Sequence, residues 1–177
     1  MLALVVIAHP FFEVPWYGND EVDRYPGRLE ILYQHISWSR PLPRWIPELA
    51  GSRGYPLFNF FNAGSLFMGL PFRAAGLDSF TAMKMALLVM LLTGGLSMAA
   101  LARRLWGEGA GIPAASMYLA APYSLSNWYH RGDFAEGWAA MLFPCILFCY
   151  VSYLQRGKRG TLLAFALAYA MLVPAHA

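Results

Sequence analysis

The sequence predicts an all-α, polytopic helical membrane protein, and three observations lead to that prediction. The 177 residues are 58% hydrophobic and only 13% charged, with a mean hydropathy of +0.43, whereas soluble domains are about 45–50% apolar and about 25% charged. Aromatic residues make up 16% of the chain, a richness typical of membrane–water interfaces. Five stretches of 18–22 residues contain no Asp, Glu, Lys or Arg: 54–72, 85–102, 109–130, 137–155 and 160–177. Each is long enough for a membrane-spanning helix, which needs about 20 apolar residues.

The composition also argues against two other classes of protein. Disorder requires low hydrophobicity and high charge, and this chain has the opposite composition. We expect no nucleic-acid partner, because the formal net charge is only +3 and Lys and Arg do not gather on a soluble face. Cys145 and Cys149 share one face of an apolar helix and are interpreted as packing residues, since neither a disulfide framework nor a zinc-binding spacing is present.

The two ends of the chain suggest a piece of a longer protein. Residues 1–12 are apolar but too short to span a bilayer, and they lack the basic start and cleavage site of a signal peptide. We interpret them as the end of a first transmembrane helix. The last apolar segment, 161–177, stops without a charged flank. We therefore expect the chain to be a fragment and to be inactive by itself.

Two basic clusters predict the orientation in the plasma membrane. Arg103 and Arg104 form one cluster, and Arg156, Lys158 and Arg159 form the other. The positive-inside rule places both clusters in the cytoplasm. Four transmembrane helices follow from this placement, at about 78–102, 110–126, 134–154 and 161–177. Residues 127–133 then lie on the extracytoplasmic side.

Residues 13–77 are predicted to form a large outer loop with two membrane-associated segments. The segment 28–38 is expected to be an interfacial helix, because its apolar and polar residues fall on opposite faces. The apolar face carries Leu29, Leu32, Tyr33 and Ile36, and the polar face carries Glu30, Gln34 and Ser37. The stretch 54–72 would begin and end outside, and Pro and Gly interrupt it. We therefore predict a re-entrant or juxtamembrane segment rather than a full span.

Two polar clusters of this outer side are the candidate functional residues. The first is Asp20, Glu21 and Asp23, whose mutual repulsion calls for a metal ion or an arginine. The second is His130, Arg131, Asp133 and Glu136, in which the two carboxylates are three residues apart and share a helix face. Ionisable groups at a membrane helix indicate a functional site. The alternatives are a solvated loop for the first cluster and a helix-capping role for Asp133.

Several strings in the sequence resemble one family of bacterial and archaeal multi-pass membrane proteins. These strings are 43–51, 54–61, 121–123 and 129–136. The family carries the label "6-pyruvoyl-tetrahydropterin synthase-related", but the sequence contains no three-histidine metal set that would support that activity. The layout also resembles GT-C-type glycosyltransferases, which have an acidic motif in the first outer loop and a second after the third span. One departure is that Tyr25 stands where related sequences often have His, three residues before Arg28.

The resemblance implies an enzyme of the cell envelope that transfers a sugar from a polyprenyl-phosphate donor on the outer membrane face. Asp20 or Glu21 would act as the base, with Asp23 not excluded. Arg28, His130 and Arg131 would bind the phosphate. Asp133 and Glu136 would hold a divalent cation, Mg²⁺ or Mn²⁺. The alternatives are a transporter or flippase, and a non-catalytic scaffold for the assembly of surface polymers.

Overall fold

A computed structural model describes residues 2–13 and 24–174, and all of the regular secondary structure in these residues is helical. Two isolated β-bridges, Ser37–Arg40 and Ile46–Tyr55, tie the loops between helices. In chain order the elements are α1 (Leu2–Glu13), α2 (Arg24–His35), α3 (Leu49–Ser52), α4 (Leu57–Phe60), α5 (Gly64–Ala74), α6 (Ser79–Trp106), the 3₁₀ turn η1 (Glu108–Ala110), α7 (Gly111–Leu119), α8 (Pro122–Leu125), the π-helix η2 (Ser126–Arg131), α9 (Phe134–Arg156) and α10 (Arg159–Ala170).

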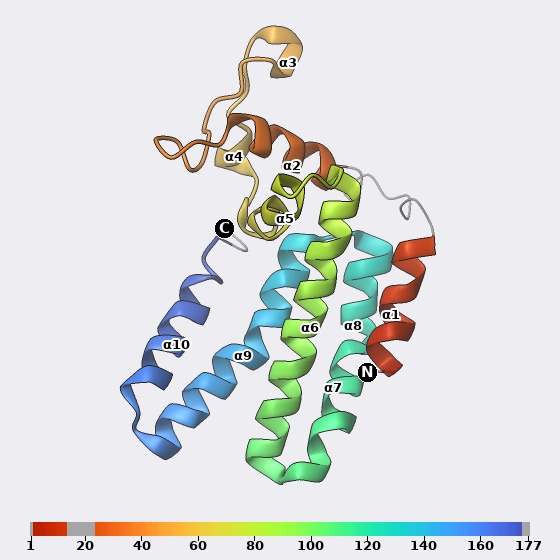
Figure 1. Cartoon of the computed structure of the whole chain (residues 1–177), viewed down its shortest axis with the longest axis vertical. Helices are drawn as coiled ribbons and strands as arrows, with labels where there is room; N and C mark the ends of the chain where they lie inside the picture. Colours follow the sequence, from red (N-terminus) through yellow and green to blue (C-terminus); the bar gives the residue numbers. More distant parts are fainter. Residues whose placement is uncertain (1, 14–23, 175–177) are drawn as a thin grey trace.

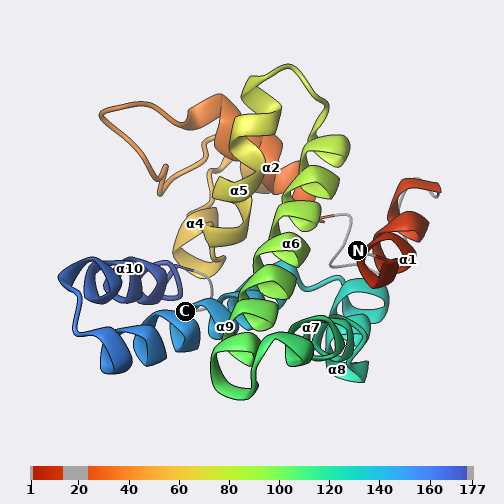
Figure 2. The same cartoon turned by 60° about the horizontal axis from the view of Figure 1, so that its bottom comes forward.

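The long helix α6 is the centre of the bundle and contacts α9, α7, α5, α2 and α1. In Figure 1, α1, α7, α8 and α9 run alongside α6, while α2, α4 and α5 cover one end of the bundle. Seen from below in Figure 2, α10 packs along α9 at the edge, away from α1. The buried side chains Met83, Leu87, Met90 and Leu91 make α6 the main contributor to the core.

In the described part of the chain, two helices are long and apolar enough to cross a membrane, α6 and α9. Their 28 and 23 residues correspond to lengths of about 42 Å and about 35 Å, compared with about 30 Å of hydrocarbon in a bilayer. These helices correspond to the predicted segments 78–102 and 134–154. The helical class is therefore confirmed, and α10 is an apolar helix of only 12 residues.

The predicted span 110–126 is divided into α7 and α8. The cause is Pro122, because a proline disfavours the helical conformation at the preceding residue. Ala121 accordingly has an extended backbone, with φ −58° and ψ 139°. The stretch 54–72 likewise contains only the short α4 and the first part of α5, whose 11 residues extend about 17 Å. Taken singly, α7, α8, α4 and α5 are each too short to cross a bilayer. The predictions that 110–126 is a span and that 54–72 is not stay predictions.

Close contacts between the central helices depend on glycine and on a proline. A Cβ atom on Gly94 would lie 2.2 Å from the Sδ of Met141, so α6 and α9 approach through that glycine. Pro144 lies inside α9 and has no N–H to donate to the carbonyl of Ala140. The hydroxyl of Tyr118, from α7, donates to that carbonyl instead. This hydrogen bond compensates for the proline and links α7 to α9.

Candidate functional site

The second predicted polar cluster forms a connected group of side chains at the start of α9. The guanidinium of Arg131 makes an ion pair with Glu136 and lies 3.7 Å from the Oδ2 of Asp133. It also donates a 3.0 Å hydrogen bond to the Oδ1 of Asn127, which is buried. One cation is thus shared by two carboxylates that are each about one-quarter exposed. We call Arg131, Asp133 and Glu136 the acidic cluster.

The backbone before α9 sets the geometry of this cluster. Residues 126–131 form a single stretch of π-helix, a feature frequent at functional sites. Gly132 then takes a left-handed conformation with φ 63°, which glycine adopts at no steric cost. Asp133 is the N-cap of α9, and its carboxylate accepts a 3.0 Å hydrogen bond from the backbone N–H of Glu136. The capping role considered for Asp133 is therefore confirmed.

A layer of buried aromatic rings lies beneath the acidic cluster. Trp128 and Phe134 are buried with their ring centroids 6.2 Å apart. A Cβ atom on Gly137 would lie 2.2 Å from the Trp128 ring, so only glycine lets the first turn of α9 approach that ring. This packing fixes the direction in which α9 begins, and therefore where Asp133 and Glu136 point.

Two tyrosines from other parts of the chain donate hydrogen bonds to the carboxylates of the cluster. Tyr25, near the start of α2, donates a 3.2 Å hydrogen bond to the Oδ1 of Asp133 and accepts one from the N–H of Ala135. Burial and the neighbouring negative charge of Asp133 raise the pKa of Tyr25, so it stays protonated as a donor. Tyr123, in α8, donates to the Oε1 of Glu136. The cluster thereby joins segments 108 residues apart.

The other predicted phosphate-binding residues occupy different positions. Arg28 is buried in α2, with its guanidinium 3.7 Å from the centroid of the Phe61 ring and 5.6 Å from that of Tyr25. It therefore lies one aromatic ring away from Asp133. His130 is part of the π-helix and its side chain is exposed. Asp20, Glu21 and Asp23 lie outside the described residues, and Asp23 immediately precedes the first residue of α2 in the sequence.

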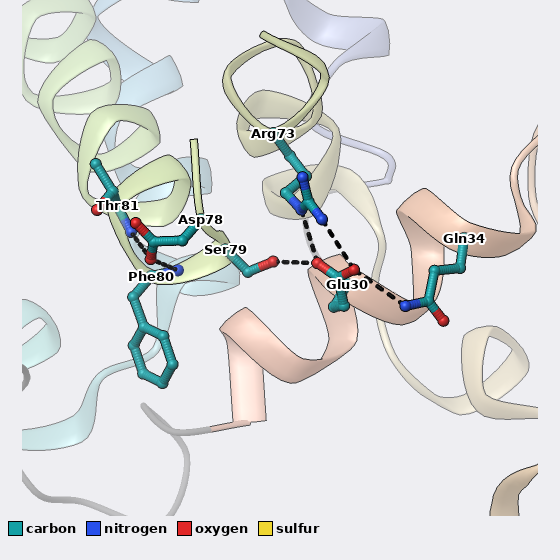
Figure 3. Close-up of polar contacts among 7 residues, drawn as sticks. All are labelled: Glu30, Gln34, Arg73, Asp78, Ser79, Phe80 and Thr81. Carbon is teal, nitrogen blue, oxygen red and sulfur yellow. Dashed lines mark hydrogen bonds and ion pairs between the residues drawn. The ribbon is translucent and has the colours of Figure 1, made fainter. Parts of the chain in front are cut away.

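A second polar group fixes α2 and α5 to the start of α6 (Figure 3). Glu30 of α2 accepts hydrogen bonds from Arg73 at 2.7 and 3.1 Å, from Ser79 at 2.6 Å and from Gln34 at 3.0 Å. These hydrogen bonds lower the pKa of Glu30 from 4.5 to about 2, with Arg73 as the largest cause. Nearby, Asp78 caps α6 by accepting from the N–H groups of the second and third helical residues. The position of α2, and hence of Tyr25, depends on this group.

An apolar pocket lies beside the acidic cluster. Its volume is about 740 Å³, and Glu136 and Tyr123 form one part of its wall. Phe143, Ala139 and Leu172 line the remainder with α7 and α8 residues. A carboxylate and a phenol thus border a cavity in the size range of small-ligand pockets.

The carboxylates fit a divalent cation only in part. Mg²⁺ requires near-octahedral coordination by oxygen atoms, some of them from water. Asp133 and Glu136 already accept hydrogen bonds and share Arg131 as a counter-ion. Within residues 2–13 and 24–174, no group of three or more His, Cys, Asp and Glu side chains is placed to hold a metal ion.

Reasoning from the sequence found the acidic cluster but missed its partners. The sequence marked Tyr25 only as a departure from the pattern before Arg28 and did not indicate that it would bind Asp133. Tyr123 lies within the 121–123 string and carried no separate signal. Glu30 was placed on a polar helix face, and nothing in the sequence indicated that Arg73, 43 residues away, would bind it.

No protein-family model matches the chain, and no curated protein or solved structure is similar enough to count as a match. The likeness to the family and to GT-C-type enzymes therefore stays a prediction. The structure by itself defines a class: over residues 2–13 and 24–174 the fold is helical, two helices are long and apolar enough to cross a membrane, and a polar cluster lies at one end of the bundle.

Proposed function

We propose that the chain is part of a multi-pass membrane glycosyltransferase that takes a sugar from a polyprenyl-phosphate donor. The observation that carries the proposal is the meeting of two separate segments at the acidic cluster. Tyr25, two residues after Asp23 in the sequence, is bonded to Asp133 at the start of α9. In GT-C-type enzymes the two acidic motifs belong to these two segments, and here the described part of each contributes to one site.

The arrangement of charge along the bundle supports an extracytoplasmic site in the plasma membrane. Arg103 and Arg104 are in the last turn of α6, and Arg156 is in the last turn of α9. Figure 1 shows both of these helix ends at the end of the bundle opposite α2. If these basic ends face the cytoplasm by the positive-inside rule, the acidic cluster faces outward.

The proposed reaction forms one bond and breaks one bond. The oxygen of an acceptor hydroxyl attacks the anomeric carbon of the sugar, and the bond from that carbon to the phosphate oxygen breaks. The electron pair leaves with the polyprenyl phosphate, and the hydroxyl proton passes to a carboxylate, for which Asp20 or Glu21 is proposed. Arg131, with Arg28 and His130 as further candidates, would stabilise the charge that develops on the phosphate.

The apolar pocket supports a lipid-linked donor in particular. It is bordered by Glu136 and Tyr123 and otherwise lined mainly by apolar side chains. A polyprenyl chain could occupy such a cavity while its phosphate reaches the neighbouring Arg131. A requirement for Mg²⁺ or Mn²⁺ remains a separate prediction, since Asp133 and Glu136 would need further oxygen ligands. No step above depends on that ion.

One observation favours a second candidate, a non-catalytic scaffold. Both carboxylates of the acidic cluster have structural partners, because Asp133 caps α9 and Glu136 bonds to Arg131 and Tyr123. A cluster that served only to join α2, α8 and α9 would have the same contacts. The glycosyltransferase needs the negative charges of Asp133 and Glu136 for sugar transfer, whereas the scaffold needs them only as far as they hold the fold together.

The variant Asp133→Asn separates these candidates, because asparagine caps a helix as well as aspartate does but carries no charge. The assay is transfer of radiolabelled sugar from membrane lipids by the full-length protein in native membranes. We expect Asp133→Asn and Glu136→Gln each to lower transfer about 100-fold. The matched control is Glu48→Gln, which removes an exposed carboxylate at the same end of the bundle as α2 and should retain activity.

The same assay with Asp20→Asn, Glu21→Gln and Asp23→Asn would identify the base. Loss of transfer in one of these variants, with normal amounts of folded protein, assigns that residue. If all three changes combined with Asp133→Asn leave transfer intact, the proposed mechanism fails. If no transfer from any polyprenyl-linked sugar depends on the wild-type protein, the scaffold is favoured.

A further inference from the structure

A shallow polar pocket lies at the opposite end of the bundle, between α6 and α9. Its volume is about 610 Å³, and the side chains of Arg103, Arg104, Glu108 and Gln155 provide its polar wall. Arg103 is 3.7 Å from Glu108, whose own side chain is 94% exposed. The Nε of Arg104 is buried and has no hydrogen-bond partner among the described residues.

An apolar groove adjoins this pocket and shares Arg103 with it. The groove lies between α6 and α7, has a volume of about 280 Å³, and is otherwise lined by apolar side chains and Ser116. Leu96 and Ile112 on its rim are 67% and 70% exposed, so the groove opens on the outer surface of the bundle. Gly111 lies directly under Arg103, because a Cβ atom there would be 2.5 Å from the Nε of that arginine. The arginine is thus held between the groove and the pocket.

We propose that this pocket and groove together bind one anionic phospholipid. The phosphate would accept hydrogen bonds from the guanidinium groups of Arg103 and Arg104 that line the pocket, and an acyl chain would lie in the groove. Two arginines against one exposed glutamate leave the pocket with a net positive charge, and Arg156 follows the lining residue Gln155 in the last turn of α9. Basic pockets between transmembrane helices bind anionic headgroups in this way.

A lipid fits better than a free phosphate ion, because Arg103 lines both compartments. A soluble phosphate would use the polar pocket alone and leave the adjoining groove without a role. The inference depends on α6 and α9 lying in a membrane. It does not depend on sugar transfer, which is proposed for the other end of the bundle.

The test measures how strongly bound lipid quenches Trp106, the last residue of α6, whose side chain is 70% exposed. The full-length protein is placed in phosphatidylcholine nanodiscs with a small fraction of brominated phosphatidylglycerol, or of brominated phosphatidylcholine as the neutral probe. The difference in fluorescence quenching between the wild-type protein and a Trp106→Phe variant measures how much lipid occupies this site. We expect brominated phosphatidylglycerol to quench at much lower concentration than the neutral probe.

Three variants make the result specific to the pocket. Arg103→Gln combined with Arg104→Gln should weaken the apparent affinity for phosphatidylglycerol about 30-fold, taking about fivefold per arginine. Lys158→Gln combined with Arg159→Gln removes two charges from the same end but outside the pocket, and should weaken it less than about threefold because exposed charges are screened. Ala115→Phe fills the groove without a change of charge and should also weaken binding.

Three outcomes would overturn the proposal. The first is equal quenching by the anionic and neutral lipids. The second is an equal loss in the Lys158 and Arg159 control. The third is complete displacement of the lipid by millimolar inorganic phosphate, together with no effect of Ala115→Phe, which would assign the pocket to a soluble anion. Normal sugar transfer in the Arg103 and Arg104 variant would leave the proposed function untouched.

Discussion

The hydrogen bond from Tyr118 to Ala140 gives a prediction whose size can be worked out from the structure. Pro144 leaves the Ala140 carbonyl without its normal helical donor, and Tyr118 supplies a donor from α7. Tyr118→Phe removes only the hydroxyl oxygen and keeps the ring. The carbonyl would then lie between packed helices with no hydrogen bond.

Two terms set the expected loss. A hydrogen bond within a protein contributes about 0.5–1.5 kcal/mol net, and a buried carbonyl left without a partner costs about 1–3 kcal/mol. Side-chain hydrogen bonds between membrane helices average about 0.6 kcal/mol, with a maximum of about 1.7. Ala140 is only partly buried, which moves the expectation toward the lower values. We therefore expect Tyr118→Phe to lower the free energy of unfolding by about 1 kcal/mol.

The assay is a double-mutant cycle with Pro144→Ala, monitored by the loss of helical circular dichroism as SDS is titrated into mixed micelles. Alanine at 144 restores an N–H that can bond to Ala140, so Tyr118→Phe should cost almost nothing in that background. The expected coupling energy is about 1 kcal/mol, above the roughly 0.3–0.5 kcal/mol within which independent sites add. An equal cost of Tyr118→Phe in both backgrounds would refute the role given to the proline.

Three further predictions concern the support of the acidic cluster. Gly137→Ala should destabilise the protein by about 1–3 kcal/mol in thermal unfolding, because the new methyl group would overlap the ring of Trp128. The control is Gly160→Ala, which should be neutral because Gly160 is a helical glycine with open space around it. Equal effects of the two substitutions would contradict this reasoning. Glu30→Gln should lower the urea midpoint of unfolding above about pH 4.5. The difference from wild type should shrink as the pH falls toward about 2, because the pKa of the Glu30 carboxyl is near 4.5 in the unfolded chain and near 2 in the folded one. A difference that does not change with pH would refute the ion pair. Asp78→Ala should cost about 1 kcal/mol and Asp78→Asn much less, since the cap needs an oxygen acceptor rather than a charge; equal costs would contradict capping.

The helices that the sequence predicts well are those whose apolar length alone determines them. The segments 78–102 and 134–154 have that length, and they form α6 and α9. The interfacial helix was expected at 28–38 and is found at Arg24–His35. It starts earlier because a proline, Pro26, is tolerated in the first turn of a helix. The segment 110–126 is divided because Pro122 disfavours helical backbone at the residue before it. Counting the length of an apolar stretch does not take this effect into account.

The candidate site could be predicted only as far as local chemistry extends. Scarce charges drew attention to Asp133 and Glu136, and both carboxylates lie near Arg131, although Asp133 is the N-cap before α9 rather than a residue on its helical face. The partners of these carboxylates come from distant segments, as Tyr25 does, and pairings of that kind are set by packing. The π-helix that delivers Arg131 was equally invisible, because its backbone depends on the burial of Trp128 and on the turn at Gly132.

The structural and chemical roles of the acidic cluster place different demands on the same residues. Capping by Asp133 requires an oxygen acceptor, and an amide provides one. The ion pair of Arg131 requires negative charge, yet one carboxylate would be enough to neutralise one guanidinium. Among the described residues the second carboxylate exceeds what the ion pair with Arg131 alone requires, and the next cation, Arg28, lies one aromatic ring away from Asp133. A charge that is only partly balanced at a membrane surface is costly to keep. A site that must bind a phosphate and release it again accounts for that excess, because a carboxylate can take over Arg131 as the phosphate departs. A scaffold needs the oxygen acceptors of Asp133 and Glu136, which an amide also provides, but only one charge for Arg131. For this reason Asp133→Asn and Glu136→Gln, rather than alanine substitutions, decide between the two.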